Sequence, residues 1–313
     1  MIEVIGLTKL YGSVAAIQDV TFSVSAGEIL GFLGPNAAGK TTTMRILAGY
    51  MPPSFGKARV AGYDVCADSL EARRHVGYLP ETVPLYTEMS VTSYLRFFAK
   101  LRGVARVGDR VDYVIDACGL KGYEDQVIGR LSRGYRQRLG LAQALVHDPD
   151  VLILDEPTVG LDPRQIADVR ALIRSLGGDH TVILSTHILP EVSQTCGRVL
   201  IIDRGSIVVE DTPQRLATRV RSGQRVVMRV QRPPSDAVEL LAAVPGVTGV
   251  NPGEDGHFVL ECDPTQECRP AIAGLAVQNG WDLLELRAED VSLEEVFLRL
   301  TGADATAEPE AAA

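Results

Sequence analysis

The stretch Gly34-Pro35-Asn36-Ala37-Ala38-Gly39-Lys40-Thr41 decides the fold of this chain. It fits the pattern G-x-x-x-x-G-K-[ST] and lies between an apolar run, EILGFL (28–33), and an amphipathic run, TTTMRILAGY (41–50). A strand leading through such a loop into a helix is typical of a phosphate-binding loop, because backbone N–H groups and the helix N-terminus attract an anion. We expect this loop and Thr42 to bind phosphate, with Lys40 on the β- and γ-phosphates and the Thr41 hydroxyl on Mg²⁺. An ordinary glycine turn is the alternative.

Two carboxylates follow a second apolar run, about 115 residues beyond Lys40. The run VLILDE (151–156) predicts a buried strand that ends at Asp155 and Glu156, and it resembles a Walker B segment. Asp155 would hold Mg²⁺ through its water shell, and Glu156 would orient or polarise the water that attacks the γ-phosphate. The alternative is a strand followed by a solvated acidic turn.

Short apolar runs alternate with longer amphipathic stretches over residues 1 to about 217, which predicts an α/β layer with a largely parallel sheet. Ligands bind at the carboxyl ends of such strands. Residues from about 89 to 130 instead carry apolar side chains at three- and four-residue spacing, so we predict a helical insertion there. The expected strands are Ile29–Leu33, Val151–Leu154, Thr181–Ser185 and Arg198–Asp203.

The Pro-Pro pair in QRVVMRVQRPPSD (224–236) marks a change of composition and predicts a domain boundary after a helix that ends near Val220. We assign residues 1–220 to the phosphate-loop domain and residues 221–301 to a small α+β domain. Residues 302–313 have almost nothing to bury, so we expect a disordered tail. The predicted order in the second domain is strand VVMRV, helix DAVELLAAV, strand VTGV, strand FVLEC, helix PAIAGLAVQNG, strand LLELR and helix SLEEVFLRL.

Composition narrows the classes of partner. The chain of 313 residues has 31 Lys plus Arg against 40 Asp plus Glu, so a general attraction to nucleic acid is not expected, although local basic patches remain possible. There is no basic start with an apolar stretch typical of an export signal, and no apolar run approaches the roughly 20 residues of a membrane helix. An odd number of cysteines without a C-x-x-C pair predicts reduced thiols and a cytosolic protein. The five cysteines are Cys66, Cys118, Cys196, Cys262 and Cys268.

A third motif separates the possible classes of phosphate-loop protein. The segment LSRGYRQR (131–138) lies roughly 24 residues before Glu156 and resembles the ABC signature, L-S-G-G-Q followed by basic residues. The chain therefore resembles the ATP-binding subunits of ABC transporters. This resemblance implies that Ser132 and Gly134, at a helix N-terminus, present a hydroxyl and N–H groups to the γ-phosphate of ATP on an opposite subunit. A simple helix cap is the alternative for Ser132.

The same resemblance assigns further residues. Tyr11 is similar to the aromatic residue that stacks on adenine, and the Gly160-Leu161-Asp162 run is similar to the loop that contacts the other subunit, with Asp162 near its nucleotide. His187, after the strand TVILST, is similar to the switch histidine that contacts the γ-phosphate. The alternatives are a packing role for Tyr11 and an ordinary capping or partly buried histidine at His187.

Several positions depart from the family pattern. Glu81, in GYLPE (77–81), stands where the family has a glutamine, and its carboxylate could bind Mg²⁺ while adding negative charge. Arg133 and Tyr135 replace a glycine and the glutamine of the signature, and Ala37 replaces a common loop glycine. These features, with the second domain, resemble the type-2 group of exporters of drugs, polysaccharides and gliding-associated cargo.

The resemblance implies an α/β P-loop ABC ATPase domain with a helical insertion, followed by a small α+β domain. It further implies Mg²⁺-dependent ATP hydrolysis in a homodimer or with a paired ATPase subunit. A separately encoded permease would contact the helical insertion and the Glu81 loop, which places the chain on the inner face of the cell membrane. The second domain has no evident catalytic cluster, and the spacing of His257, Cys262 and Cys268 fits no strong metal site. We therefore expect this domain to stabilise the dimer or to regulate it.

Two alternatives remain at this stage. One is a non-transport ABC ATPase that acts on nucleic acid or ribosomes, which the acidic balance and the single cassette disfavour. The other is a nucleotide-dependent regulatory or scaffold protein with impaired hydrolysis, suggested by Ala37 and Glu81. An unrelated GTPase is disfavoured because the sequence has no N-K-x-D motif.

Overall fold

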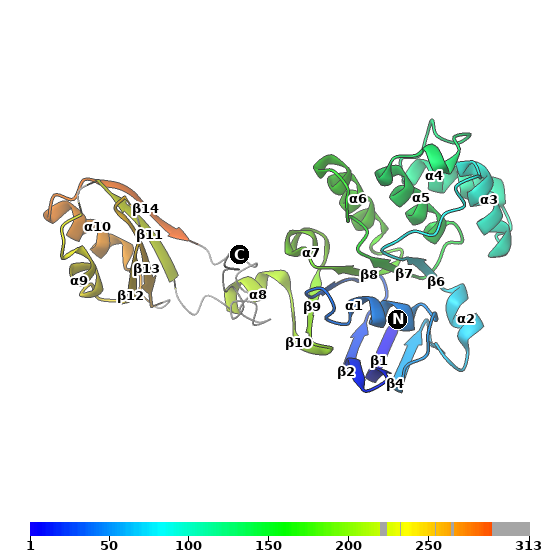
Figure 1. Ribbon diagram of the computed structural model, residues 1–313, viewed down its shortest axis with the longest axis horizontal. Coiled ribbons are helices and arrows are strands. Elements are labelled where there is room, and N and C mark those ends of the chain that lie inside the picture. Colours follow the sequence, from blue (N-terminus) through cyan, green and yellow to red (C-terminus); the bar gives the residue numbers. More distant parts are fainter. Residues whose placement is uncertain (220–223, 232, 254, 264–265, 290–313) are drawn as a thin grey trace, which may run out of the picture. The chain divides into compact units, whose positions relative to one another are not determined.

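The computed structural model describes residues 1–219, 224–231, 233–253, 255–263 and 266–289 (Figure 1). The chain divides into two units, Met1–Pro213 and Gln214–Ala313, and each is described by itself. The division lies a few residues before the boundary predicted near residue 220. Among the described residues, no helix combines the length and apolar character needed to cross a membrane.

A six-stranded sheet forms the centre of the first unit, in the order β10-β9-β3-β8-β7-β6. Neighbours from β9 to β6 pair in parallel, whereas β10 pairs antiparallel with β9. The four strands expected from the sequence all lie in this sheet, so the predicted α/β layer is confirmed. The bounds are β3 Ile29–Leu33, β6 Val76–Leu79, β7 Val151–Asp155, β8 Thr181–Thr186, β9 Arg198–Asp203 and β10 Ser206–Asp211.

A second sheet of the first unit is antiparallel and was not predicted. Its order is β2-β1-β4-β5, with bounds β1 Ile2–Tyr11, β2 Val14–Val24, β4 Phe55–Val60 and β5 Tyr63–Asp64. Helix α1 (Lys40–Leu47) shares one buried core with both sheets, through Met44, Ile46 and Leu47. The helix that follows the phosphate loop is therefore fixed by apolar packing on either side.

The remaining helices of the first unit include the predicted insertion. Within it lie α3 (Val91–Leu101), α4 (Val107–Ala117) and a 3₁₀ helix, η1 (Ile128–Arg130). Helix α3 buries Val91, Tyr94, Leu95 and Ala99, which form one face at helical spacing. Helix α5 (Arg133–Leu145) packs against both α3 and α4. Helices α2 (Ser69–Arg74), α6 (Pro163–Leu176) and α7 (Leu189–Thr195) complete the described set up to Pro213, where α8 (Pro213–Arg219) begins.

The second unit is a split β-α-β-β-α-β arrangement. It runs β11 (Gln224–Val230), α9 (Ala237–Ala242), β12 (Val247–Pro252), β13 (His257–Cys262), α10 (Arg269–Gln278) and β14 (Leu283–Glu289). The strands form an antiparallel sheet in the order β12-β13-β11-β14. Its core packs strand residues such as Met228 and Leu260 against Leu241, Ile272 and Trp281. The first six predicted elements are present; the predicted helix SLEEVFLRL and the predicted disordered tail lie outside the described residues.

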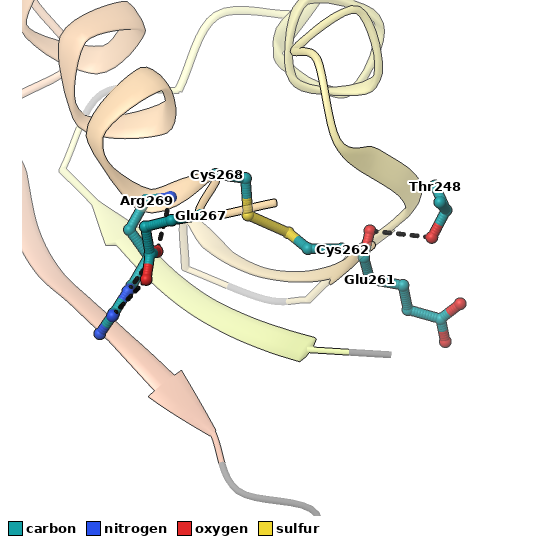
Figure 2. The surroundings of a disulfide bond; sticks show 6 residues. All are labelled: Thr248, Glu261, Cys262, Glu267, Cys268 and Arg269. Carbon is teal, nitrogen blue, oxygen red and sulfur yellow. Dashed lines mark hydrogen bonds and ion pairs between the residues drawn. A yellow bond between two sulfur atoms is a disulfide. The ribbon is translucent and has the colours of Figure 1, made fainter. Parts of the chain in front are cut away.

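One prediction about the cysteines is wrong. Cys262, the last residue of β13, forms a disulfide with Cys268, which immediately precedes α10 (Figure 2). The sequence suggested reduced thiols because the cysteine number is odd and the spacing is not C-x-x-C, but Cys262 and Cys268 lie together in the core of the second unit. Cys66, Cys118 and Cys196 are free. The cysteine pattern therefore no longer argues for a reducing compartment.

Candidate functional site

The phosphate loop joins β3 to α1 with two residues in the left-handed region of the backbone. Gly39 has φ +106°, and a Cβ there would lie 2.6 Å from the Ile17 side chain and 2.7 Å from the Ala16 carbonyl oxygen. No other residue fits this position without a shift of the backbone. Ala37 has φ +64°, so the alanine that replaces a common glycine adopts the conformation that a glycine would favour.

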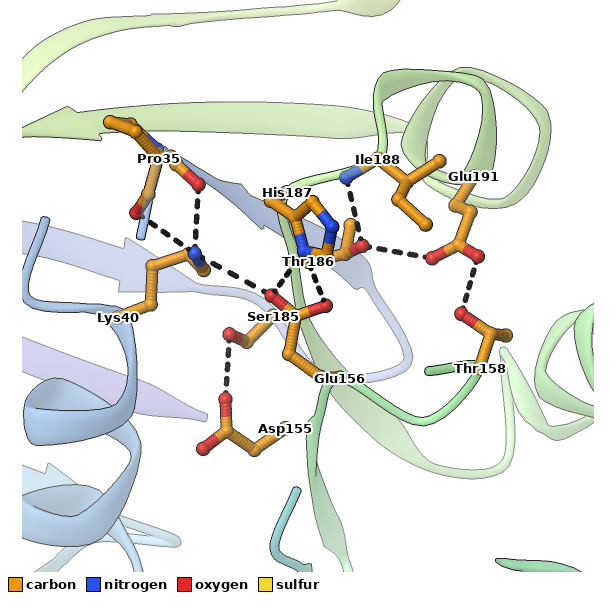
Figure 3. A network of polar contacts seen from close by, with 11 residues as sticks. Pro35, Lys40, Asp155, Glu156, Thr158, Ser185, Thr186, His187, Ile188 and Glu191 are labelled. Atoms are coloured by element: carbon orange, nitrogen blue, oxygen red, sulfur yellow. Dashed lines mark hydrogen bonds and ion pairs between the residues drawn. The ribbon is translucent and has the colours of Figure 1, made fainter. Parts of the chain in front are cut away.

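Lys40 is buried at the start of α1 and its ammonium group is held by three oxygens. Its Nζ donates to the carbonyl oxygens of Gly34, at 2.7 Å, and Pro35, at 3.1 Å, and lies 3.5 Å from Glu156 Oε1 (Figure 3). The loop thus holds the positive charge at its centre. A phosphate group that entered the loop would compete with Glu156 for this ammonium group.

Asp155 ends β7 beneath the loop with one oxygen satisfied and one orphaned. Ser185 Oγ, from β8, donates to Asp155 Oδ1 at 2.8 Å. Asp155 Oδ2 is buried and has no hydrogen-bond partner in the structure as described. Burial raises the pKa of Asp155, the Ser185 hydrogen bond and the neighbouring Thr41 hydroxyl oppose that rise, and the charges of Glu156 and Glu81 add to it. An unpartnered, buried carboxylate oxygen beside a threonine hydroxyl fits the hard oxygen ligands of Mg²⁺.

Glu156 lies between two basic side chains. His187 Nδ1 is 3.0 Å from both Glu156 carboxylate oxygens, and Lys40 approaches one of them (Figure 3). Glu156 has φ +50°, an unusual conformation for a residue other than glycine, and its N–H donates to the Ser185 carbonyl oxygen at 2.9 Å. The strained turn at the end of β7 aims the carboxylate into the site.

A buried network behind His187 was missed at the sequence level. Glu191 is almost fully buried and accepts hydrogen bonds from Thr158 Oγ1 and, at 2.9 Å, from Thr186 Oγ1 (Figure 3). Thr186 Oγ1 also accepts the Ile188 N–H at 3.1 Å, so the turn that carries His187 is fixed on either side. The only signal was a charged residue within the apolar run ILPEV.

The predicted residues of the phosphate-loop half come together at a cavity of about 640 Å³. Gly34, Pro35 and Ala38 lie outside the lining, although the carbonyl oxygens of Gly34 and Pro35 accept hydrogen bonds from the Lys40 ammonium group. Asp155 is buried and also lies outside the lining. The lining contains two residues that the sequence did not indicate, Ala16 and Val159. Its predicted members are Asn36, Ala37, Gly39, Lys40, Thr41, Thr42, Glu81, Glu156 and His187.

The other predicted residues do not line this cavity. Tyr11 is half-exposed, and its hydroxyl donates to Met51 Sδ at 3.2 Å. Ser132 caps α5 by accepting the Tyr135 N–H, and Asp162 caps α6 by accepting the N–H groups of Arg164 and Gln165. Within one chain, the helix-cap alternative therefore describes Ser132, and its role toward an opposite subunit stays a prediction.

Comparison with known proteins decides the family. Residues 17–159 match a family model described as ABC transporter. The bacitracin transport ATP-binding protein BcrA of Bacillus licheniformis is 34% identical over 304 residues, which span 96% of this chain and 97% of that protein. The chain belongs to the ABC transporter family.

Further ABC proteins agree in sequence and fold. The daunorubicin/doxorubicin resistance ATP-binding protein DrrA of Streptomyces peucetius is 35% identical, over 96% of this chain and 92% of that protein. A solved ATP-binding subunit of an ABC transporter has a TM-score of 0.64 at 28% identity, covering 71% of this chain and 93% of that one. The cassette MJ0796, in a dimeric post-hydrolysis state bound to ADP and Pi, has a TM-score of 0.63 at 21% identity, covering 68% of this chain and 99% of that one, which shows the fold alone.

These findings confirm the predicted ABC ATPase fold and the nucleotide chemistry. The chain is an ATP-binding subunit of an ABC transporter and hydrolyses ATP, and the regulatory protein without hydrolysis and the GTPase are set aside.

Proposed function

We propose that the chain is the ATPase subunit of an exporter, which drives a separately encoded membrane permease through Mg²⁺- and ATP-dependent closure of a dimer. The observation that carries the chemistry is the Glu156 carboxylate, buried and held between Lys40 and His187 at a cavity large enough for a triphosphate. The names of similar proteins, which concern bacitracin transport, daunorubicin/doxorubicin resistance and Nod factor export, support transport out of the cell.

The geometry supports an in-line displacement at the γ-phosphate. Water oxygen attacks phosphorus, the bond to the β–γ bridging oxygen breaks, and ADP leaves with the electron pair of that bond. Glu156 orients this water and accepts its proton, and His187 holds the carboxylate in place. Lys40 balances negative charge on the phosphate oxygens.

The metal would be held by the Asp155 carboxylate, whose Oδ2 has no other partner in the described structure, together with the Thr41 hydroxyl. When bound, Mg²⁺ supplies positive charge that neutralises phosphate oxygens. Among the described residues, no three His, Cys, Asp or Glu side chains form a metal site by themselves. Phosphate oxygens of the nucleotide and water would be further ligands. Glu81, which lines the same cavity, would add a further carboxylate.

The remaining half of each ATP site would come from the opposite subunit. Ser132 and Gly134 begin α5, a helix of 13 residues whose N-terminal N–H groups and positive dipole end suit a γ-phosphate. Asp162 begins α6 in the loop that follows Glu156. A two-fold dimer that faces these residues toward the partner's phosphate loop completes two sites at once.

The permease would dock near the helical insertion. A hollow of about 760 Å³ lies between the end of α1, α2 and α3, and its exposed apolar members include Tyr50, Leu70 and Leu101. Arg73 and Arg102 also line it. Apolar surface flanked by arginines suits a short amphipathic helix with acidic ends. Leu101→Glu should lower permease-stimulated ATP hydrolysis in proteoliposomes that contain the permease.

This assignment implies a peripheral protein on the inner face of the cell membrane.

The proposed ATPase activity is tested by phosphate release from ATP in the purified full chain, with and without Mg²⁺. Lys40→Ala should lower turnover by at least about 100-fold, the cost of losing one pre-organised charge in such a site. Lys57→Ala, which removes an exposed lysine from β4, is the matched control and should behave as the parent chain does. ATP binding without Mg²⁺-dependent phosphate release by the parent chain would contradict the proposal and favour a scaffold protein.

A further inference from the structure

The start of α5 and the loop that follows the catalytic glutamate interlock through two glycines. Gly160 lies in that loop with φ +74°, and a Cβ at this position would be 2.2 Å from the Arg133 guanidinium carbon and 2.5 Å from its Nε. Arg133 therefore fills the space that the missing side chain of Gly160 leaves open.

The second contact runs in the opposite direction. A Cβ on Gly134, at the start of α5, would lie within 2.4–2.5 Å of the three amide atoms at the end of the Gln165 side chain. Gln165 belongs to the first turn of α6, where it forms a capping box with Asp162. Each segment thus accommodates a side chain of the other over a glycine, which neither an alanine at 134 nor one at 160 would allow without a shift.

A third contact fixes the two helices farther along their lengths. Arg138 Nη2, on α5, lies 2.7 Å from Asp168 Oδ2, on α6, with the arginine side chain largely buried. The same arginine donates to the carbonyl oxygen of Cys118 at 3.3 Å. Helix α5 is therefore anchored to α6 from its first turn to its second, and a displacement of its N-terminus is transmitted to the 159–162 loop.

We propose that Arg133, which replaces a glycine of the usual signature, is a positioning residue: by packing over Gly160 it couples the phosphate contact of the signature segment to the loop that carries Glu156. This rests on the proposed two-fold dimer, in which the signature segment faces the partner's ATP while Glu156 faces its own. Occupation of one site would then set the position of the catalytic glutamate in the other.

The role of Arg133 is one of volume and shape rather than of charge. Arg133 is exposed at the first position of α5, where a positive charge opposes the helix dipole. Methionine is unbranched, similar in reach and uncharged, so it can occupy the same space over Gly160. Lysine keeps the charge on an unbranched stem of similar reach. A direct phosphate contact in the partner site would be preserved by lysine and lost with methionine, so the two variants separate the two roles.

The experiment measures ATP hydrolysis by the full chain as a function of ATP concentration. Arg133→Ala should lower kcat about fivefold and bring the Hill coefficient toward about 1, the value for independent sites. The Kd for ATP and the Tm should stay at the parent values, because the phosphate loop and the core are untouched. Arg133→Met should restore the Hill coefficient, whereas a direct phosphate contact would be restored by Arg133→Lys and not by Arg133→Met. Arg174→Ala, at an exposed position in the last turn of α6, is the matched control.

A double-mutant cycle tests the contact itself. Gly160→Ala should reproduce the effect of Arg133→Ala, since its Cβ would displace the guanidinium group, and the double variant should lose no more than Gly160→Ala alone. Additive losses would overturn the contact as the cause, and rescue by lysine rather than methionine would overturn the packing role. Parental kcat and Hill coefficient in Arg133→Ala, with an active and dimeric parent, would refute this inference alone, whereas an inactive parent would refute the proposed function.

Discussion

The two halves of the proposed ATP site are held by different forces within one chain. In the phosphate-loop half, Lys40, Glu156 and His187 converge on one cavity through polar contacts of 3.0–3.5 Å. In the signature half, Ser132 and Asp162 are engaged as caps of α5 and α6. The first half is assembled before a partner arrives. The second is a pair of helix ends whose donors would become part of an ATP site only in the proposed dimer.

The halves also differ in charge. The phosphate-loop half contains three carboxylates. Burial raises the pKa of Asp155, and the charges of the nearby Glu156 and Glu81 raise it further. The first turn of α5 reads RGYR, from Arg133 to Arg136, and carries no acidic residue. Basic residues at a helix N-terminus are unfavourable unless an anion lies nearby. In the proposed dimer, the phosphates of ATP would therefore join the two halves electrostatically.

The largest effect is expected when the proposed proton acceptor of the phosphate-loop half is removed. Glu156→Gln keeps the shape of the side chain but cannot accept a proton, so ATP turnover should fall about 10²- to 10⁴-fold. ATP binding should persist, because one negative charge near the phosphates is removed. Single-turnover phosphate release and equilibrium ATP binding measure the two quantities. Glu3→Gln, an exposed position on β1, is the control. Parental turnover in Glu156→Gln would remove this residue from the proposed mechanism.

The next largest effect is expected from a substitution at the start of α5, in the signature half. Ser132→Arg, combined with Glu156→Gln, should prevent the ATP-dependent dimer that light scattering detects in Glu156→Gln alone. In the otherwise unmodified chain it should lower turnover about 100-fold, because the long side chain would occupy the space that the partner's γ-phosphate needs and displace it from its productive position.

Two controls separate the interface from the helix cap. Ser132→Ala removes the hydroxyl without adding bulk, costs about 1 kcal/mol of helix capping, and should still dimerise. Ser175→Arg adds the same bulk at an exposed position near the end of α6. A dimer that forms equally well with Ser132→Arg would show that the two-fold assembly does not use the signature face.

The sequence was sufficient for the phosphate-loop half because each of its residues follows a strand. Lys40 comes after β3, Glu156 after β7 and His187 after β8, and the carboxyl ends of neighbouring parallel strands meet at one edge of the sheet. The order of the motifs therefore implied their meeting in space. The family resemblance added His187, which the chain pattern alone left as an ordinary histidine.

The remainder depended on neighbours that local patterns do not show. The antiparallel sheet was missed because β1 and β2 pair with several register shifts, which interrupt the alternation expected of a half-buried strand. Glu191 could not be assigned because its partners, Thr158 and Thr186, come from two other segments. The Cys262–Cys268 pairing depends on a turn between β13 and α10 that the spacing alone does not specify.

A smaller effect on ATP binding tests the charge difference between the two halves. Glu81→Gln removes one negative charge from the cavity and should tighten ATP binding about threefold when EDTA removes Mg²⁺, as expected for a partly screened charge at the surface of a site. With Mg²⁺ present the gain should shrink or reverse, because the amide is a poorer Mg²⁺ ligand than the carboxylate. ATP titrations at both conditions measure this difference. An equal gain in both conditions would exclude Glu81 as a metal ligand.

The smallest effect concerns stability in the absence of nucleotide. Burial raises the pKa of Asp155, so its contribution to stability is full below the ordinary pKa of an aspartate and is lost as pH rises through the raised value. Above that raised pKa the ionised, half-unpartnered carboxylate is therefore destabilising. Asp155→Asn should raise the Tm of the metal-free chain by about 2–4 °C, the shift that about 1 kcal/mol produces in a domain of this size. The gain should disappear as pH falls through the raised pKa of Asp155, where the aspartate is itself protonated, and the variant should lose the stabilisation that Mg²⁺ with ATP gives the parent. A lower Tm for Asp155→Asn at pH 7 would mean that the carboxylate is satisfied without a cation, and that the phosphate-loop half is not built around one.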